Sequence, residues 1–371
     1  MTRLATFRER LQNQGFDAAV FMPTANLRYL TNLNFHPGKR LNLTVITTND
    51  DKPSVVLPAL EVPGIRNQAD NLNLYPWADA DGPQTAVNQA LAKFRTPVTL
   101  GIEHVAMRVM ELRALETTAS ARGIQLQTRD ITPLIADMRM VKDAEEQANM
   151  AEAARRVEIA LKKAVAQITE GMTEQQLTRL ISDEILSAAK GESFGSFAAF
   201  GPNTANPHHQ PGDRPLQKGD LIIIDCGAAH NGYSSDITRT FAFGDPSDKK
   251  RDIYNTVLKA NEAGKAAVKP NATGEEIDRA TRQVIESAGY GEYFIHRTGH
   301  GLGIDTHPCH EAPDLMEGST TPFAIGTTFT IEPGIYIEGL GGVRIEDDVV
   351  ITEDGCHSFT NFERELMILS D

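Results

Sequence analysis

The sequence has few cysteines and no long apolar run, and each shortage argues against a class of protein. Its three cysteines, Cys226, Cys309 and Cys356, are odd in number and far apart. This spacing argues against a disulfide framework and favours a reducing compartment. No window approaches the roughly 18 apolar residues of a membrane span, and the charged first 20 residues lack the apolar core of a signal peptide. We therefore expect a cytoplasmic protein without a membrane partner.

Basic residues are also scarce. The 371 residues include 36 Lys and Arg against 50 Asp and Glu, which gives a formal net charge of −14. Nucleic-acid binding requires a basic surface, so we expect no nucleic-acid partner. The hydrophobic share of 40% and the charged share of 23% are those of an ordinary globular protein. At this length, two domains are expected.

The N-terminal part, residues 1–130, alternates between strand and helix signals. Buried strands are predicted over 17–22, 41–47, 54–58 and 98–103, and helices over 5–14, 84–94 and 107–121. This alternation predicts an α/β domain with a largely buried sheet.

Residues 131–371 are predicted to form a second domain, with 131–143 as the junction. A long amphipathic helix is expected from Asp143 to about Ile168. Capping-box spacing marks three helix starts, at Asp143 with Glu146, Thr173 with Gln176, and Thr273 with Glu276. The later strands alternate or pair locally, so their sheet is expected to be antiparallel. The predicted class of this domain is α+β.

Two predicted hairpins each carry two acids. The first runs from LIIIDCG to YSSDITRT. A turn centred between His230 and Asn231 places Asp225 opposite Asp236, whereas a turn centred on Asn231 and Gly232 makes Asp236 a diagonal neighbour on the same face. In the second hairpin, a turn centred on Gly339 places Glu332 opposite Glu346.

Facing acids on apolar strands would repel one another if they were buried. Two such pairs therefore predict a pair of divalent cations between them. A set of oxygens with one imidazole suits Mn, Co, Zn or Fe. Strand alternation turns Cys226 away from Asp225 and into the core, and Asp347 and Asp348 are expected to be ordinary surface acids outside the site.

Histidines gather near these acids. His300 lies between glycines in TGHGLG, which suits a metal ligand on a tightly packed loop. Further loop histidines are candidates for proton transfer or for holding an oxyanion: His208, His209, His296, His307 and His310.

These motifs resemble the pita-bread metallopeptidases, which include methionine aminopeptidase, aminopeptidase P and proline dipeptidase. HRTGHGLG, TIEPGIY and VRIEDD are close to the motifs of the Xaa-Pro branch, and DAAVFMPTANLRYLTNLNF resembles its creatinase-type N-terminal domain. The resemblance covers nearly the whole chain. It implies a pita-bread catalytic domain over 131–371, behind a creatinase-like domain over 1–130.

The resemblance also implies a metal centre with two divalent ions, Mn or Co, with Zn or Fe as alternatives. Its ligands are Asp225, Asp236, His300, Glu332 and Glu346. Asp225 and Glu346 would contact both ions, Asp236 one, and His300 with Glu332 the other. A hydroxide held between the ions would attack the peptide carbonyl.

Roles outside the metal centre follow from the same resemblance. Glu332 would carry the proton, and His208 would support the tetrahedral intermediate. The second substrate histidine matches His307 by its distance from His300 but His310 by the residues that follow, and we favour His307. His296 and Arg344 would contact the prolyl end of the substrate, although an ordinary salt bridge is an equal alternative for Arg344.

The predicted function is hydrolysis of Xaa-Pro dipeptides, as by prolidase. The main alternative is an Xaa-Pro aminopeptidase that acts on longer peptides. Two remote alternatives are a metal-free creatinase-like hydrolase, which would lack the full ligand set, and a non-enzymatic binding module, which would have lost ligands. The resemblance also implies a homodimer.

Overall fold

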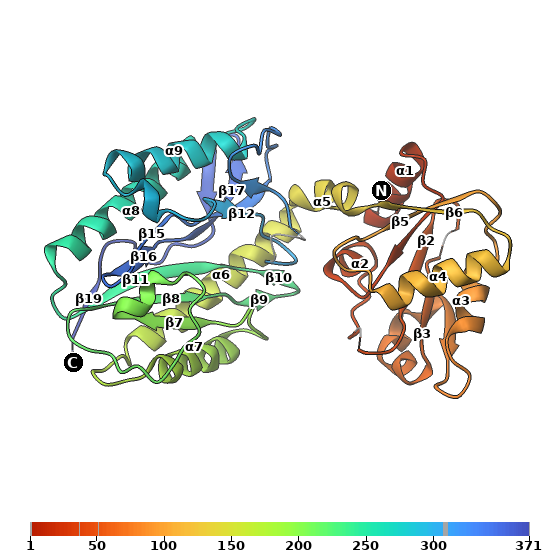
Figure 1. Cartoon of the computed structure of the whole chain (residues 1–371), viewed down its shortest axis with the longest axis horizontal. Coiled ribbons are helices and arrows are strands. Elements are labelled where there is room, and N and C mark those ends of the chain that lie inside the picture. The colour runs from red at the N-terminus through yellow and green to blue at the C-terminus, as the bar shows by residue number, and fades with distance from the viewer. Residues whose placement is uncertain (1, 37, 51, 307–310, 371) are drawn as a thin grey trace. The chain divides into compact units, whose positions relative to one another are not determined.

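The computed structural model describes residues 2–36, 38–50, 52–306 and 311–370. The chain divides into two compact units, Met1–Met138 and Arg139–Asp371 (Figure 1). Among the described helices, none combines the length and apolar character needed to cross a membrane.

The described part of the first unit is built on a six-stranded sheet with the order β4-β3-β2-β1-β5-β6. Its strands are β1 (Ala18–Phe21), β2 (Leu43–Thr47), β3 (Ser54–Pro58), β4 (Asn73–Trp77), β5 (Val98–Ile102) and β6 (Leu126–Asp130). The four predicted strands are confirmed as β1, β2, β3 and β5. The sheet is mixed, because β1–β2 and β2–β3 are antiparallel while the other pairs are parallel.

Helices pack around this sheet. They are α1 (Arg3–Asn13), α2 (Ala25–Thr31), the 3-10 segment η1 (Ala59–Asn71), α3 (Gln84–Ala90) and α4 (Val109–Ala121). Helix α5 (Thr132–Met140) contains the boundary between the two units. Valine, leucine and alanine side chains of β1, β2, β5 and α3 form the core, which explains why these strands read as continuous apolar runs.

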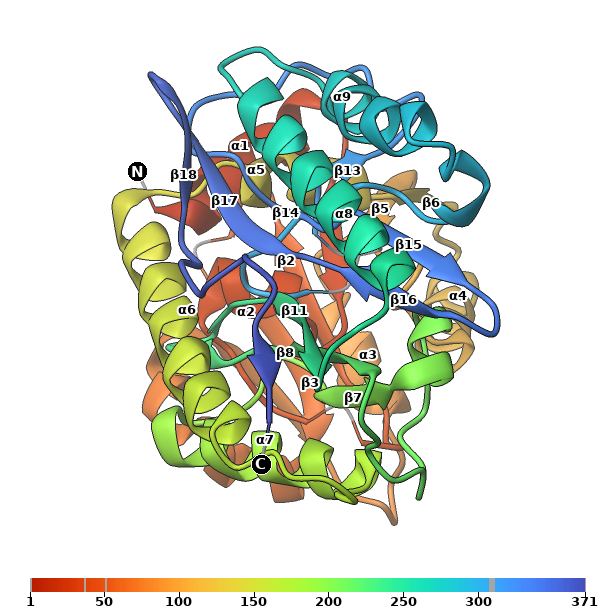
Figure 2. The same ribbon diagram turned by 90° about the vertical axis from the view of Figure 1, so that its left-hand side faces the viewer.

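The second unit contains two helix pairs. They are α6 (Ala144–Val165) with α7 (Glu174–Ala188), and α8 (Asp248–Ala267) with α9 (Gly274–Ser287). The predicted capping boxes are confirmed at the starts of α6, α7 and α9. In Figures 1 and 2 the strands of this unit lie between the two pairs.

Short strands fill the space between the helix pairs. They are β7 (Phe197–Phe200), β8 (Asp220–Cys226), β9 (Ala229–His230), β10 (Tyr233–Ser234), β11 (Ile237–Phe243), β12 (Gly299–His300), β13 (Asp314–Leu315), β14 (Thr328–Ile331), β15 (Gly334–Ile337), β16 (Gly341–Arg344), β17 (Asp347–Thr352), β18 (Gly355–Ser358) and β19 (Ile368–Leu369), with the 3-10 turns η2 (Gly201–Ala205) and η3 (Gly291–Tyr293). The described pairings are antiparallel, as predicted, except that β19 runs parallel to β11.

Strand β8 shows how this packing orients an acid. Ile222, Ile224 and Cys226 join the apolar cluster of α6 and α7. Leu221 points the other way, into the cluster of α8. Because strand residues alternate between faces, Asp225 lies on the face opposite Cys226. Cys226 is fully buried, as predicted for a core residue.

Candidate metal centre

The first hairpin adopts the second of the two predicted registers. Asp225 pairs with Thr238, so Asp236 is its diagonal neighbour. The turn residues Asn231 and Gly232 both have positive φ, 49° and 86°, as a two-residue type I′ turn requires. The register centred between His230 and Asn231 is therefore wrong. Its two turn residues would be His230 and Asn231, whereas the residues with positive φ are Asn231 and Gly232.

The second hairpin confirms its predicted turn at Gly339. The β15–β16 and β14–β17 ladders share one register, in which Glu332 and Glu346 oppose each other at the break between them. Each acid directs its backbone N–H elsewhere: Glu332 to the Thr298 carbonyl at 2.8 Å, and Glu346 to the Thr238 carbonyl at 3.1 Å. The strands therefore part where the two acids lie.

His300 faces these acids from β12. Its Nε2 lies 3.7 Å from Oδ2 of Asp236 and 3.5 Å from Oε1 of Glu332. Its Nδ1 lies 2.9 Å from the Gly301 carbonyl oxygen, so Nδ1 carries the proton and Nε2 presents a lone pair to the acids. A metal-binding histidine usually has this arrangement.

The glycines beside His300 permit close backbone packing. A Cβ on Gly299 would lie 1.9 Å from the Thr330 carbonyl oxygen, and one on Gly301 would lie 2.2 Å from the Ala312 carbonyl oxygen. Both positions therefore exclude any larger residue. This confirms the close packing predicted for the loop.

The acids perturb one another strongly. Burial raises the pKa of Glu332 to about 7, with a further rise from Asp225. Burial and the charge of Glu332 raise the pKa of Glu346 to about 8. Burial, together with Glu346 and Asp225, raises the pKa of Asp236 well above its usual range. Burial lowers the pKa of His300.

The donor set fits a divalent cation. Ligand atoms of Asp236, His300 and Glu346 lie within 4.8 Å of one another. Oδ1 of Asp225 is buried and has no hydrogen-bond partner among the described residues. A bound cation would satisfy this oxygen and remove the repulsion that raises the carboxyl pKa values.

A cavity of about 390 Å³ opens over these residues. All five predicted ligands line it, and so do His208, His296 and Arg344. His307 and His310 lie outside the described residues, so the choice between them stays a prediction.

Comparison with known protein families gives a match in each of the two units. Residues 148–353 match metallopeptidase family M24, and residues 3–141 match the creatinase/prolidase N-terminal domain. The chain belongs to metallopeptidase family M24.

Relatives of this M24 peptidase match over nearly their whole length. It is 34% identical to the Xaa-Pro dipeptidase of Lactobacillus helveticus, covering 99% of this chain and 98% of that protein. The crystal structure of a dipeptidase from Pyrococcus horikoshii OT3 matches with a TM-score of 0.91 and 38% identity, over 99% and 100% of the two chains. The prolidase of Thermococcus sibiricus matches with a TM-score of 0.93 and 34% identity, over 99% and 98%.

A buried tyrosine that the sequence analysis missed, Tyr336, contacts two residues of the cavity wall. The Tyr336 hydroxyl lies 2.9 Å from Nε2 of His296 and 3.2 Å from Nη1 of Arg344. Cβ atoms on Gly334 or Gly342 would collide with the Tyr336 ring. The signal was present in the sequence, because Tyr336 follows Glu332 by four residues and so shares its side of the segment.

Arg344 forms the salt bridge considered for it, and its contact with the substrate stays a prediction. It lines the cavity, and it also forms an ion pair with Asp225 and donates a hydrogen bond from Nε to Thr238 Oγ1 at 3.0 Å. Burial lowers the pKa of the neighbouring His296 to about 4, with a further lowering by Arg344, so this imidazole is neutral at neutral pH. Other cavity-lining residues that the sequence analysis did not single out are Phe194, Phe197, Pro207, Arg297 and Thr306.

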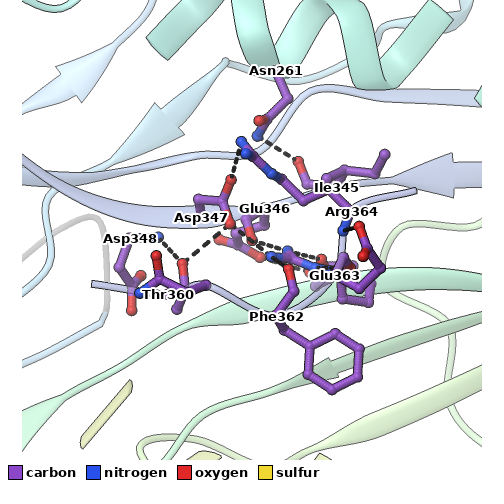
Figure 3. A network of polar contacts seen from close by, with 12 residues as sticks. Asn261, Ile345, Glu346, Asp347, Asp348, Thr360, Phe362, Glu363 and Arg364 are labelled. Carbon is purple, nitrogen blue, oxygen red and sulfur yellow. Dashed lines mark hydrogen bonds and ion pairs between the residues drawn. The ribbon is translucent and has the colours of Figure 1, made fainter. Parts of the chain in front are cut away.

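The expectation that Asp347 and Asp348 are surface acids was wrong, because the structure buries both, although neither lines the cavity. Asp347 forms ion pairs with Arg239, Lys265 and Arg364, and Figure 3 shows it in the middle of this network. Asp348 accepts a hydrogen bond from the Asp236 backbone N–H at 2.9 Å. Their cationic and backbone partners come from distant segments, which local spacing does not reveal.

Proposed function

We propose that this M24 peptidase hydrolyses Xaa-Pro dipeptides with the help of two divalent ions, Mn or Co. The observation that carries the proposal is the group of mutually repelling acids and one unprotonated imidazole nitrogen in a single cavity wall. The Lactobacillus helveticus relative is named for this dipeptidase activity, which supports the substrate class.

Asp225, Asp236, His300, Glu332 and Glu346 would hold the ions. When bound, divalent ions would neutralise these acids and lower the pKa of a water molecule, so that hydroxide would be available at neutral pH to attack a peptide carbonyl. The same charges would also lower the carboxyl pKa values.

The chain's own groups would supply the remaining chemistry. Glu332 is suited to move a proton from the attacking water to the leaving nitrogen, since its carboxylate lies in the cavity wall beside His300. His208, in the same wall, would donate a hydrogen bond to the developing oxyanion. His296 and Arg344 would contact the prolyl end of the substrate.

A cytoplasmic location and a homodimer stay predictions from the sequence and the family resemblance. Gel filtration with light scattering would measure the assembly state.

The decisive experiment compares two substrate lengths at controlled metal content. The protein is stripped with a chelator and reloaded with Mn or Co, and turnover is measured on an Xaa-Pro dipeptide and on the same peptide extended at its C-terminus. Metal-dependent turnover that favours the dipeptide is expected. Equal or faster turnover of the longer peptide would establish an aminopeptidase instead, and full activity without metal would refute the proposed centre.

A further inference from the structure

A buried glutamate outside the cavity holds the segment that carries His208. Glu174 is the first residue of α7, and its side chain is fully buried. Its Oε1 accepts hydrogen bonds from the Phe200 backbone N–H and the Asn203 amide, both at 2.9 Å. Its Oε2 accepts one from the Gly212 N–H at 3.0 Å and lies 2.8 Å from Nε2 of His209. One carboxylate therefore gathers four groups from a single stretch of chain.

These four partners flank His208 on both sides. Phe200 and Asn203 precede it, and His209 and Gly212 follow it. Pro207 and His208 line the cavity, whereas His209 contacts Glu174. The two consecutive histidines thus have different surroundings: His208 belongs to the cavity wall, and His209 belongs to the anchor of its segment.

The rest of the segment is fastened by neutral contacts. Thr204 Oγ1 accepts a hydrogen bond from the Gly342 N–H at 2.7 Å and donates one to the Gly201 carbonyl at 2.5 Å. These contacts attach η2 to β16, but they lie before Pro207. Glu174 differs because it joins the two ends of the segment through a charged group.

The chemistry of the Glu174 contact requires a carboxylate. Burial alone would raise the pKa of Glu174, but hydrogen bonds from Gly212, His209 and Asn203 outweigh burial, and the pKa is lowered. Its place at a helix start also favours negative charge. A glutamine has almost the same shape, yet its amide NH₂ would face two donors where the second carboxylate oxygen now accepts.

We propose that Glu174 is a positioning residue for Xaa-Pro hydrolysis, which fixes segment 200–212 so that His208 stays in the cavity wall. Glu174 lines no part of the cavity and acts through the backbone of this segment. The inference rests on the proposed function, because it assumes that His208 assists the reaction.

The first test measures the position of the segment without using activity. Hydrogen exchange followed by mass spectrometry is compared between the metal-loaded wild type and Glu174→Gln. Exchange is expected to accelerate in peptides covering 200–212, because the amide NH₂ replaces one of the two oxygens and the backbone N–H of either Phe200 or Gly212 loses its acceptor, with little change elsewhere in the second unit. Glu146→Gln is the matched control, because Glu146 is also a buried carboxylate in the first turn of a helix, where it contacts Asp143 and Tyr233.

The second test is a double-mutant cycle with His208→Ala. Glu174→Gln alone is expected to lower kcat/KM by about 10- to 100-fold, as expected for a displaced catalytic group. In the His208→Ala background, the same change is expected to lower kcat/KM by less than about 3-fold, because residues that act as one unit are not additive. His209→Ala, which removes one of the four partners, is expected to shift exchange and activity in the same direction by smaller amounts, and it replaces Glu174→Gln if that variant does not fold.

The outcomes separate the inference from the function on which it rests. Unchanged exchange over 200–212, fully additive losses, or an equal activity loss in Glu146→Gln would overturn the role of Glu174. Full activity in His208→Ala would instead refute the proposed catalytic role of His208, and exchange would still decide whether Glu174 holds the segment.

Discussion

Glu346 and Asp347 are neighbours in the sequence, but they lie in two different buried clusters, and their pKa values are shifted in opposite directions. Glu346 joins Asp236 and Glu332 in the cavity wall, where the pKa values of all three are raised. Asp347 lies in the network of Figure 3. Burial alone would raise its pKa, but Arg239 and Lys265 outweigh burial, and the pKa is lowered.

The difference lies in where the compensating charge comes from. Asp347 receives its cations from the chain itself, so its network can stabilise the fold unaided. In the cavity wall, Arg344 pairs with Asp225, which leaves the remaining acids undercompensated. Because a buried uncompensated charge costs several kcal/mol, the cavity cluster must take up either protons or cations from outside the chain. The Asp347 network is compensated by the chain itself, whereas the cavity cluster fits the metal centre proposed above.

The largest expected effect comes from changing a carboxylate to an amide in the cavity cluster. Glu346→Gln removes one negative ligand, so metal content is expected to fall and kcat/KM to drop by at least about 100-fold. Stability of the metal-free protein should rise slightly, because one repelling acid is lost. Metal analysis, peptide hydrolysis and thermal unfolding measure these effects. Glu338→Gln, in the exposed turn of the same hairpin, is the control and should change none of them.

The same change from carboxylate to amide at the next residue should lower stability and leave metal binding unchanged. Asp347→Asn leaves Arg239 and Lys265 without their carboxylate, so the free energy of unfolding is expected to fall by about 3–5 kcal/mol. Metal content per folded molecule should stay near the wild-type value. Urea unfolding and metal analysis give the two readouts. Loss of metal without loss of stability would contradict the assignment of Asp347 to a structural network.

Metal removal should reveal the repulsion in the cavity cluster as a dependence of thermal stability on pH. A carboxyl whose pKa is raised in the folded state stabilises the fold at pH values below its ordinary pKa, which is 4.5 for glutamate. This stabilisation is lost as the pH rises through the pKa of the folded state, which is about 7 for Glu332 and about 8 for Glu346. The Tm of the chelated protein is therefore expected to fall between about pH 5 and pH 8, measured by calorimetry in low-phosphate buffers.

Reloading with Mn or Co should flatten this dependence, because bound cations restore the ionised carboxylates. The Asp347 network should contribute differently: since its pKa is lowered, its stabilisation is present above the ordinary value of 3.8 and is lost at lower pH. Both forms should therefore unfold in acid. A chelated protein that is equally stable at pH 5 and pH 8 would argue against the repulsion.

The sequence predicted the cavity cluster better than the Asp347 network, and there is a physical reason. Asp225, Asp236, Glu332 and Glu346 lie on hairpins, so period-two alternation and turn chemistry suffice to bring them together. The first hairpin still left two registers open, since both residues beside Asn231 could belong to the turn.

Contacts between distant segments were not predictable in this way. Asp347 meets Arg239 and Lys265 across a large sequence separation, and no local pattern distinguishes it from a surface acid. Strands β4 and β6 were also missed. Their residues are mostly half-buried or exposed, so they lack the continuous apolar pattern that identified β1 and β5.

A matched pair of threonines offers the mildest comparison of the two clusters. Thr238 donates a hydrogen bond to Glu346 Oε2 at 2.6 Å and accepts one from Arg344 Nε at 3.0 Å. Thr360 donates one to Asp347 Oδ1 at 3.2 Å and accepts one from the Asp348 N–H at 3.0 Å. Each hydroxyl is buried and has one acid and one N–H as partners.

Replacing either threonine by valine keeps the shape and removes the hydroxyl. Each change is expected to lower the free energy of unfolding by about 1–3 kcal/mol, the usual cost of leaving buried partners unsatisfied. Only Thr238→Val should also weaken metal binding, by about 10-fold or more, because it removes the hydrogen bond that orients Glu346, a proposed metal ligand. Metal titration of both variants measures the difference. Equal loss of metal affinity in Thr360→Val would mean that the two clusters are coupled through Glu346 and Asp347.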